Sequence, residues 1–316
     1  MKKIIQVTTY PFGKDHSLQK EILESSGWEV NYNPYDRRLK NEEVKDLVRD
    51  ANAIVAGTET YDRDIIESCK NLEMICRVGI GLDSVDLEAC KDNNVIVTYT
   101  PEAPSDSVAE LTVAQIINLL RQINRSNTDV HDGKWIRQMG FLISELKIGI
   151  LGIGRIGGRV AKLLQPFKPQ LYGCDLEPNL ELGKQCDIQW VSKDELFKIC
   201  NLVTVHIPLN KDNYHLVGKH ELGLMQDNSY LINTSRGKVC SENDIIEALD
   251  NKKLLSAAFD VYEKEPYSGP LIGRNDVILT AHIASSSRQG RFLMELGAAE
   301  DCTRIILGKT PYNRIC

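Results

Sequence analysis

Residues 147–157 read KIGILGIGRIG, an apolar run that passes into three spaced glycines. The run predicts a β-strand, and the residues after Gly157 carry apolar side chains at helical spacing. Gly152 allows a tight turn, Gly154 leaves the backbone open to close approach, and Gly157 lets the helix pack near its strand. The N–H groups and dipole at the start of that helix attract an anion. The pattern therefore predicts a strand–turn–helix unit that binds the pyrophosphate of a dinucleotide.

An acidic residue stands where the ribose of such a dinucleotide would bind. Asp175 follows Gly157 by 18 residues and comes directly after a second strand-like run, residues 170–174. Its carboxylate can accept hydrogen bonds from ribose hydroxyls, and its charge would repel a 2′-phosphate. We therefore predict NAD, rather than NADP, as the cofactor.

Composition excludes several classes of protein. A length of 316 residues predicts two domains. The net charge is −6 without a dense basic block, which argues against nucleic acid and a membrane surface as partners. No apolar run reaches the roughly 18 residues that a membrane span needs. Nine cysteines, an odd number with no C-x-x-C pair, indicate reduced thiols in a cytoplasmic protein. We expect no metal site.

Strand-like and helix-like segments alternate along the chain, which is typical of α/β proteins with parallel sheets. In the first part of the chain, strands are expected at residues 4–7, 28–32, 53–56, 74–78 and 95–97. Residues 101–105 contain two prolines and predict a linker.

A long helix is expected from Ser107 to Arg125. Its apolar residues cover more than one helical stripe, and they are Leu111, Val113, Ile116, Ile117, Leu119, Leu120 and Ile123. Such breadth is typical of a helix buried between domains or against a second subunit. We therefore expect a homodimer.

Three polar residues follow predicted strands in the second part of the chain. His206, Arg236 and His282 lie at the ends of the strand-like runs 202–208, 229–237 and 277–282. In open α/β sheets, ligands bind beyond the carboxyl ends of the strands. These residues are therefore candidates for the chemistry.

Arg236, Glu265 and His282 together suit the oxidation of a hydroxy acid by a nicotinamide cofactor. An arginine offers a planar fork to a carboxylate. A histidine has a pKa near working pH and can exchange a proton with the substrate oxygen. An acid beside it, here Glu265, can orient the ring and hold its proton.

Three further motifs follow the glycine loop. Residues 232–237 read INTSRG, residues 260–266 read DVYEKEP, and residues 279–285 read LTAHIAS. In this order they resemble the D-isomer-specific 2-hydroxyacid dehydrogenases, and the resemblance covers nearly the whole chain. Residues 77–86 (RVGIGLDSVD) and 109–112 (AELT) are most similar to short-form D-3-phosphoglycerate dehydrogenases.

The resemblance implies roles for individual residues. Arg236 would bind the substrate carboxylate and carbonyl, His282 would be the acid/base, and Glu265 would hold its proton. The backbone of Val78 and Gly79 would also meet the carboxylate. The residues implied to contact NAD are Gly152, Gly154, Arg155, Ile156, Gly157, Asp175, His206, Pro208, Thr234, Ser235, Asp260 and Ala284.

The resemblance also implies two parallel-sheet domains. A Rossmann-type NAD-binding domain, residues 99–284, would be inserted in a flavodoxin-like substrate domain made of residues 1–98 and 285–316. Two positions depart from the family pattern. Ala281 replaces the proline usual before the catalytic histidine, and the loop 56–61 (AGTETY) carries Glu59 where phosphate-binding relatives often place arginine.

The expected activity is interconversion of a D-2-hydroxy acid and its 2-oxo acid. The substrate could be 3-phosphoglycerate, although Glu59 would repel a phosphate, or another small acid such as hydroxypyruvate or glyoxylate. An alternative of another class is an NAD(H)-sensing protein like the C-terminal-binding-protein corepressors, which share this fold. A formate dehydrogenase of the same fold needs no acid beside its histidine, so Glu265 argues against it.

Overall fold

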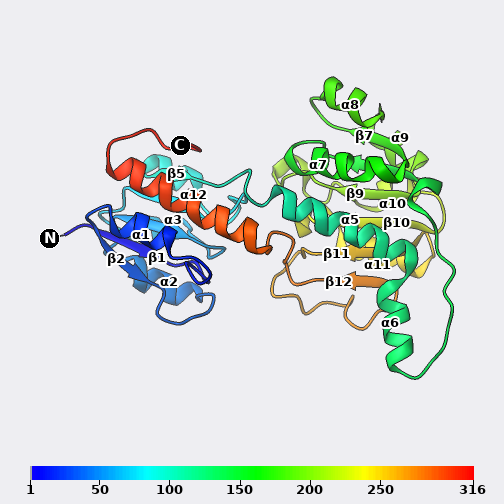
Figure 1. The fold of residues 1–316 in the computed structure, drawn as a ribbon, viewed down its shortest axis with the longest axis horizontal. Helices are drawn as coiled ribbons and strands as arrows, with labels where there is room; N and C mark the ends of the chain where they lie inside the picture. The colour runs from blue at the N-terminus through cyan, green and yellow to red at the C-terminus, as the bar shows by residue number, and fades with distance from the viewer. Residues whose placement is uncertain (1) are drawn as a thin grey trace. The chain divides into compact units, whose positions relative to one another are not determined.

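The computed structural model describes residues 2–316, which divide into two compact units. Unit 1 comprises the chain up to Pro104 together with Ser286–Cys316, and unit 2 comprises Ser105–Ser285. Each unit is built around its own all-parallel sheet (Figure 1). Among the described residues, no helix is both long enough and apolar enough to cross a membrane.

Unit 1 contains a five-stranded sheet in the order β2-β1-β3-β4-β5, which is the flavodoxin-like order. Its elements are β1 (Ile4–Val7), α1 (Leu18–Glu24), β2 (Glu29–Tyr32), α2 (Asn41–Val48), β3 (Ala53–Ala56), α3 (Arg63–Ser68), β4 (Met74–Arg77), α4 (Leu87–Asp92), β5 (Ile96–Thr98) and α12 (Arg288–Ile306). All five strands expected from the sequence are present.

Two apolar clusters cover the two faces of the unit 1 sheet. One contains Val44, Ile65 and Ala89 from helices α2, α3 and α4. The other contains Leu23 of α1 and Cys302 of α12, so the last helix of the chain completes the core begun by the first strands. Figure 1 draws α12 alongside α1, although more than 250 residues separate them in the sequence.

Unit 2 contains a seven-stranded sheet in the order β12-β11-β10-β9-β6-β7-β8. Its strands are β6 (Lys147–Leu151), β7 (Gln170–Cys174), β8 (Ile188–Trp190), β9 (Leu202–Val205), β10 (Ser229–Asn233), β11 (Leu254–Phe259) and β12 (Val277–Leu279). Its α-helices are α5 (Ser105–Arg121), α6 (Ile123–His131), α7 (Arg155–Leu164), α8 (Leu180–Cys186), α9 (Lys193–Ile199), α10 (Lys219–Leu224) and α11 (Glu242–Asp250).

In unit 2, successive strands are added first on one side of β6 and then on its other side. The chain first adds β7 and β8 on one side of β6, and then β9 to β12 on the other. This is the Rossmann arrangement, in which the switch point lies where the ligand binds. The sequence prediction of an α/β fold with a Rossmann-type and a flavodoxin-like sheet is confirmed.

Helices cover both faces of the unit 2 sheet. Residues of α5 and α7, such as Ile116 and Val160, are buried in one apolar cluster. Residues of α9, α10 and α11, such as Phe197, Leu222 and Leu249, are buried in the other. With both faces covered, the strands are nearly continuous apolar runs, as expected for a parallel sheet.

The prediction of one helix from Ser107 to Arg125 is wrong at the C-terminal end. Helix α5 stops at Arg121, and Gln122 adopts a left-handed backbone with φ of 51°. That conformation cannot continue a right-handed helix, so a separate helix α6 begins at Ile123. The broad apolar surface of α5 is also accounted for within the unit, because Val113 and Ile117 pack against its own core.

Residues 99–104 belong to unit 1 by their contacts. The backbone N–H of Thr100 donates to the Gly79 carbonyl at 3.0 Å, and the Tyr99 N–H donates to the Asn313 carbonyl at 3.2 Å. The chain therefore passes into unit 2 at the start of α5, and it passes back between Ser285 and Ser286.

Candidate active site

The candidate residues of unit 2 share one edge of its sheet. The strands are all parallel, so their carboxyl ends lie at the same edge. The glycine loop follows β6, Asp175 follows β7, and His206 follows β9. Strands β10, β11 and β12 are followed by Arg236, Asp260 and His282. This edge of the seven-stranded sheet is the candidate active site.

The three glycines of the loop meet different surroundings. Gly152 has a φ of 89°, and a Cβ there would lie 2.7 Å from Cγ2 of Ile207. A Cβ on Gly157 would lie 2.0 Å from the carbonyl oxygen of Gly152. A Cβ on Gly154 would meet no atom within 4 Å. Gly152 and Gly157 are therefore required by the protein itself, whereas space stays open beside Gly154.

Helix α7 begins at this open space, and no side chain caps it. The first N–H groups of a helix need partners, and they attract anions together with the helix dipole. By contrast, Ser192 caps α9 and Ser287 caps α12 with side-chain oxygens. The loop 152–157 thus fits the pyrophosphate of NAD, with Gly154, Arg155 and Ile156 at the helix start.

Asp175 is held beside the glycine loop by backbone groups. Its Oδ2 accepts a hydrogen bond from the Ile153 N–H at 2.6 Å, and its Oδ1 accepts one from the Glu177 N–H at 3.0 Å. Each carboxylate oxygen can accept a further hydrogen bond. The position of Asp175 therefore fits the ribose hydroxyls of NAD.

The most direct contact among the candidate residues joins His282 to Glu265. The Nδ1 atom of His282 lies 2.8 Å from Oε2 of Glu265, and both side chains are partly exposed. The sequence therefore identified two residues, 17 positions apart, that the fold brings into contact. With Nδ1 facing the carboxylate, Nε2 of His282 is left to face a substrate.

Asp260 shapes the turn that carries His282. Its buried carboxylate accepts hydrogen bonds from the N–H groups of Ile283 and Ala284, both at 2.8 Å, and from the Thr280 hydroxyl at 2.6 Å. The His282 N–H donates to the Asp260 carbonyl at 2.9 Å, and His282 has a φ of 52°. Asp260 therefore holds a backbone conformation that a non-glycine residue rarely adopts. The implied contacts of Asp260 and Ala284 with NAD stay predictions.

The segment that carries Arg236 is held by its neighbour Asn233. Oδ1 of Asn233 accepts hydrogen bonds from the Ser235 N–H at 2.9 Å and the Ser235 hydroxyl at 2.8 Å, and Nδ2 donates to the Arg236 carbonyl at 2.9 Å. The hydroxyl of Thr234 lies 3.0 Å from that of Thr112 on α5. Sequence reasoning missed the roles of Asn233 and Thr112, although Asn233 lies within the motif 232–237.

His206 is a neutral residue in this environment. Desolvation lowers its pKa to about 3, and its Nε2 lies 2.9 Å from the Thr204 hydroxyl. The imidazole therefore stays uncharged at neutral pH, and the implied contact of His206 with NAD stays a prediction. Pro208 follows it and is exposed at the same sheet edge.

Val78 and Gly79 lie in unit 1, directly after β4. The Val78 N–H donates to the Ala56 carbonyl at 2.9 Å, and the Gly79 N–H donates to the Thr100 hydroxyl at 2.8 Å. Glu59, in the loop after β3, is only 2% exposed. Its carboxylate therefore lies in the interior of unit 1, and the expected repulsion of a phosphate by Glu59 stays a prediction.

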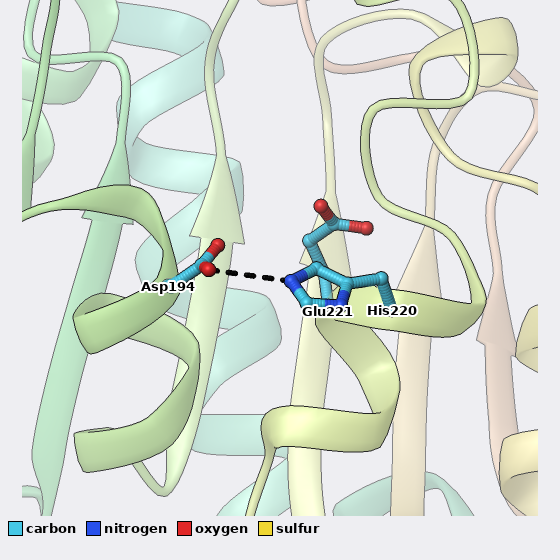
Figure 2. A group of neighbouring side chains, drawn as sticks. All are labelled: Asp194, His220 and Glu221. Atoms are coloured by element: carbon cyan, nitrogen blue, oxygen red, sulfur yellow. Dashed lines mark hydrogen bonds and ion pairs between the residues drawn. The ribbon is translucent and has the colours of Figure 1, made fainter.

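One group of side chains in the described residues has the composition of a metal site. Asp194 of α9 lies beside His220 and Glu221 of α10, and Figure 2 shows the contact between His220 Nε2 and Asp194 Oδ2. That distance is 3.3 Å, while Glu221 is paired with Lys193 and accepts a hydrogen bond from the Gly218 N–H at 3.2 Å. Ion pairing and helix capping account for these side chains, so the cluster gives no support to a metal.

Comparison with known proteins identifies the family. The NAD-binding domain of the D-isomer-specific 2-hydroxyacid dehydrogenases matches residues 113–284. The chain belongs to this family. The match covers the glycine loop, Asp175, Arg236, Glu265 and His282, and it supports NAD as the cofactor of this dehydrogenase-family chain.

Relatives named for different activities resemble this dehydrogenase-family chain. It is 31% identical to a D-3-phosphoglycerate dehydrogenase of Methanocaldococcus jannaschii over 87% of this chain and 53% of that protein. It is 30% identical to a glyoxylate reductase of Thermococcus litoralis over 85% of this chain and 84% of that protein. The chain thus spans about half the length of the phosphoglycerate dehydrogenases it matches.

Solved structures support the same fold. The TT0316 protein from Thermus thermophilus is 27% identical, with a TM-score of 0.89 over 99% of this chain and 100% of that chain. The two parallel sheets are therefore arranged within each unit as in known structures of comparable length.

Proposed function

We propose that the protein reduces a 2-oxo acid to a D-2-hydroxy acid with NADH, and catalyses the reverse reaction with NAD. The observation that carries this proposal is the 2.8 Å contact between His282 Nδ1 and Glu265 Oε2. The pair lies at the same sheet edge as a glycine loop suited to a dinucleotide. When bound, the cofactor would supply or accept the hydride.

The proposed roles of the protein's own residues follow from their chemistry. The Arg236 guanidinium binds the substrate carboxylate and orients the carbonyl. As hydride reaches the carbonyl carbon, the electron pair of the C=O bond moves to oxygen, and Nε2 of His282 delivers a proton there. Glu265 accepts a hydrogen bond from Nδ1–H, which fixes the ring and favours its charged form.

The cofactor contacts implied by the sequence belong to this proposal. Asp175 binds the ribose, and the start of α7 binds the pyrophosphate. Further contacts come from His206, Pro208, Thr234, Ser235, Asp260 and Ala284. The backbone of Val78 and Gly79, in unit 1, would also bind the substrate carboxylate. On this proposal unit 2 is the NAD-binding domain and unit 1 the substrate domain.

A panel of 2-oxo acids tests the proposal. Purified protein is mixed with NADH and with 3-phosphohydroxypyruvate, hydroxypyruvate, glyoxylate or pyruvate, and loss of NADH absorbance is followed. We expect turnover of at least one acid and its loss in the Arg236→Ala and His282→Ala variants. The absence of NADH oxidation across the panel would contradict the proposal.

The same panel decides between phosphorylated and unphosphorylated substrates. The relatives include phosphoglycerate dehydrogenases and glyoxylate reductases, and the buried carboxylate of Glu59 leaves both classes open. The ratio of kcat/KM for 3-phosphohydroxypyruvate to that for hydroxypyruvate measures the contribution of the phosphate. Tight NADH binding with no turnover would instead favour the corepressor-like alternative.

We also propose a homodimer, supported by an apolar surface on unit 2. Helix α6 buries none of its residues, and the loop after it extends that exposure. The exposed apolar side chains of this segment are Ile123, Val130, Trp135, Ile136, Met139, Phe141 and Leu142, with Trp135 81% and Met139 89% exposed. Large apolar side chains exposed in this number on one segment suit an interaction site, and a second copy of the chain offers the same segment in return. A monomer in sedimentation equilibrium would contradict this proposal.

A cytoplasmic location is proposed from the thiols. All nine cysteines are free, and seven of them are buried. Reduced thiols at this number are typical of a reducing compartment. Fractionation of cells that express the protein at its natural level tests the location.

A further inference from the structure

Tyr262 contacts Glu265 and the segment that carries His282 through different groups. Its backbone N–H donates to Oε1 of Glu265 at 3.1 Å, while Oε2 of the same carboxylate faces His282. Its hydroxyl donates to the carbonyl of Thr280, two residues before His282, at 2.8 Å. One residue therefore fixes the acid from one side and the turn that carries the histidine from the other.

The same residue also lies against the segment that carries Arg236. A Cβ on Gly237 would lie 1.9 Å from the carbonyl carbon of Tyr262 and 2.0 Å from its oxygen. Only glycine allows this approach, so the residue after Arg236 is in direct contact with the backbone of Tyr262. The segments of all three candidate catalytic residues thus meet at Tyr262.

The ring of Tyr262 is itself held in place. It stacks on Tyr267, with ring centroids 4.2 Å apart. The Tyr267 hydroxyl donates to Oε1 of Glu242 at 2.6 Å, at the start of α11. Burial raises the pKa of Tyr262 to about 12, so its hydroxyl remains a hydrogen-bond donor at neutral pH.

We propose that Tyr262 is a positioning residue, which sets the geometry of Glu265 and His282 through its N–H and its hydroxyl and supports the Arg236 segment through its carbonyl. The inference rests on the proposed function, because Tyr262 acts through these three residues. A positioning residue matters because small displacements of catalytic groups cost a large share of the rate.

The test is the Tyr262→Phe variant, which removes the hydroxyl and keeps the ring. We expect kcat for 2-oxo acid reduction to fall by about tenfold, with the Kd for NADH unchanged, because one hydrogen bond of ordinary strength is lost. We also expect the alkaline limb of the kcat/KM profile to move to lower pH. Without the Tyr262 hydroxyl, Glu265 stabilises the protonated form of His282 less well, so His282 loses its proton at a lower pH.

Tyr267→Phe is the matched control. It removes a hydroxyl from the other ring of the stack, which bonds Glu242 and the Leu271 N–H but not the Thr280 carbonyl. We expect Tyr267→Phe to lower Tm by about as much as Tyr262→Phe does, and to leave the pH profile unchanged. Equal effects of both variants on kcat and Tm, without a shift in the profile of Tyr262→Phe, would show a merely structural role and overturn the proposal.

An NMR titration keeps this test separate from the proposed function. The imidazole signal of His282 is assigned by its loss in His282→Gln, and its titration is compared between wild type and Tyr262→Phe. We expect the midpoint to move to lower pH in the variant, whether or not any 2-oxo acid is turned over. An unchanged midpoint would overturn the inference, whereas failure of the substrate panel would overturn the proposed function alone.

Discussion

The glycine loop and the His282–Glu265 pair lie at one edge of the same sheet, yet they are built in different ways. The loop owes its form to missing side chains, because a Cβ on Gly157 would collide with the Gly152 carbonyl oxygen. The geometry of the pair depends instead on hydrogen bonds made by Asp260, Tyr262 and Thr280. The loop is encoded in one short stretch of sequence, whereas the pair needs the segments that follow two separate strands, β11 and β12.

This difference shows which changes each region tolerates. A substitution in the loop acts through steric collision and should affect folding and cofactor binding together. A substitution around the pair removes a hydrogen bond or a proton donor and should affect turnover first. The following predictions test that distinction, from the largest expected effect to the smallest.

His282→Ala should lower kcat by about 10²- to 10⁴-fold, the usual contribution of a general acid. The side chain is partly exposed, so Tm and the Kd for NADH should change little. The measurements are steady-state rates, thermal unfolding and NADH titration. His220→Ala is the control, because His220 is an exposed histidine paired with Asp194 and should retain wild-type turnover.

Gly157→Ala should destabilise the fold by about 1–3 kcal/mol, since its Cβ meets backbone that cannot move aside. Gly154→Ala should change stability by less, because a Cβ there meets nothing, and should mainly weaken NADH binding. Thermal unfolding and NADH titration of the two variants give the contrast. Equal losses of Tm would show that the two glycines do not differ as the structure indicates.

Asp260→Asn should cost about 1–3 kcal/mol of stability and lower kcat as well. The amide replaces one acceptor oxygen with a donor that faces an N–H group of residues 283–284, which leaves buried polar groups unpaired. Denaturant unfolding and steady-state rates measure the two effects. Wild-type kcat in a destabilised variant would show that the turn holds His282 without Asp260.

Asp175→Asn should reduce the preference for NADH over NADPH by about tenfold, or about 1.4 kcal/mol. The amide oxygen can still accept from Ile153 or Glu177, so the loop is retained while the charge that repels a 2′-phosphate is removed. The ratio of kcat/KM for the two cofactors is the measurement. Equal use of both cofactors by the wild-type protein would place the carboxylate away from the ribose.

Much of the fold could be predicted because its signals are local. Apolar runs predicted the strands of unit 1, and the spacing of the glycines predicted the turn between β6 and α7. The end of α5 could not be predicted, because Gln122 carries no sequence signal for a left-handed backbone. The burial of the Glu59 side chain could not be predicted either, since a carboxylate in a loop is usually exposed.

The sequence by itself determined the chemistry available to this protein. The glycine spacing, Asp175 and the residue types Arg236, Glu265 and His282 are readable without coordinates, because each depends on the identity and local spacing of residues. Only the tertiary structure decided that Glu265 meets Nδ1 of His282, that Asp260 holds the turn behind it, and that Tyr262 contacts all three segments. Those contacts join residues from separate strands, and the parallel sheet alone brings their ends together.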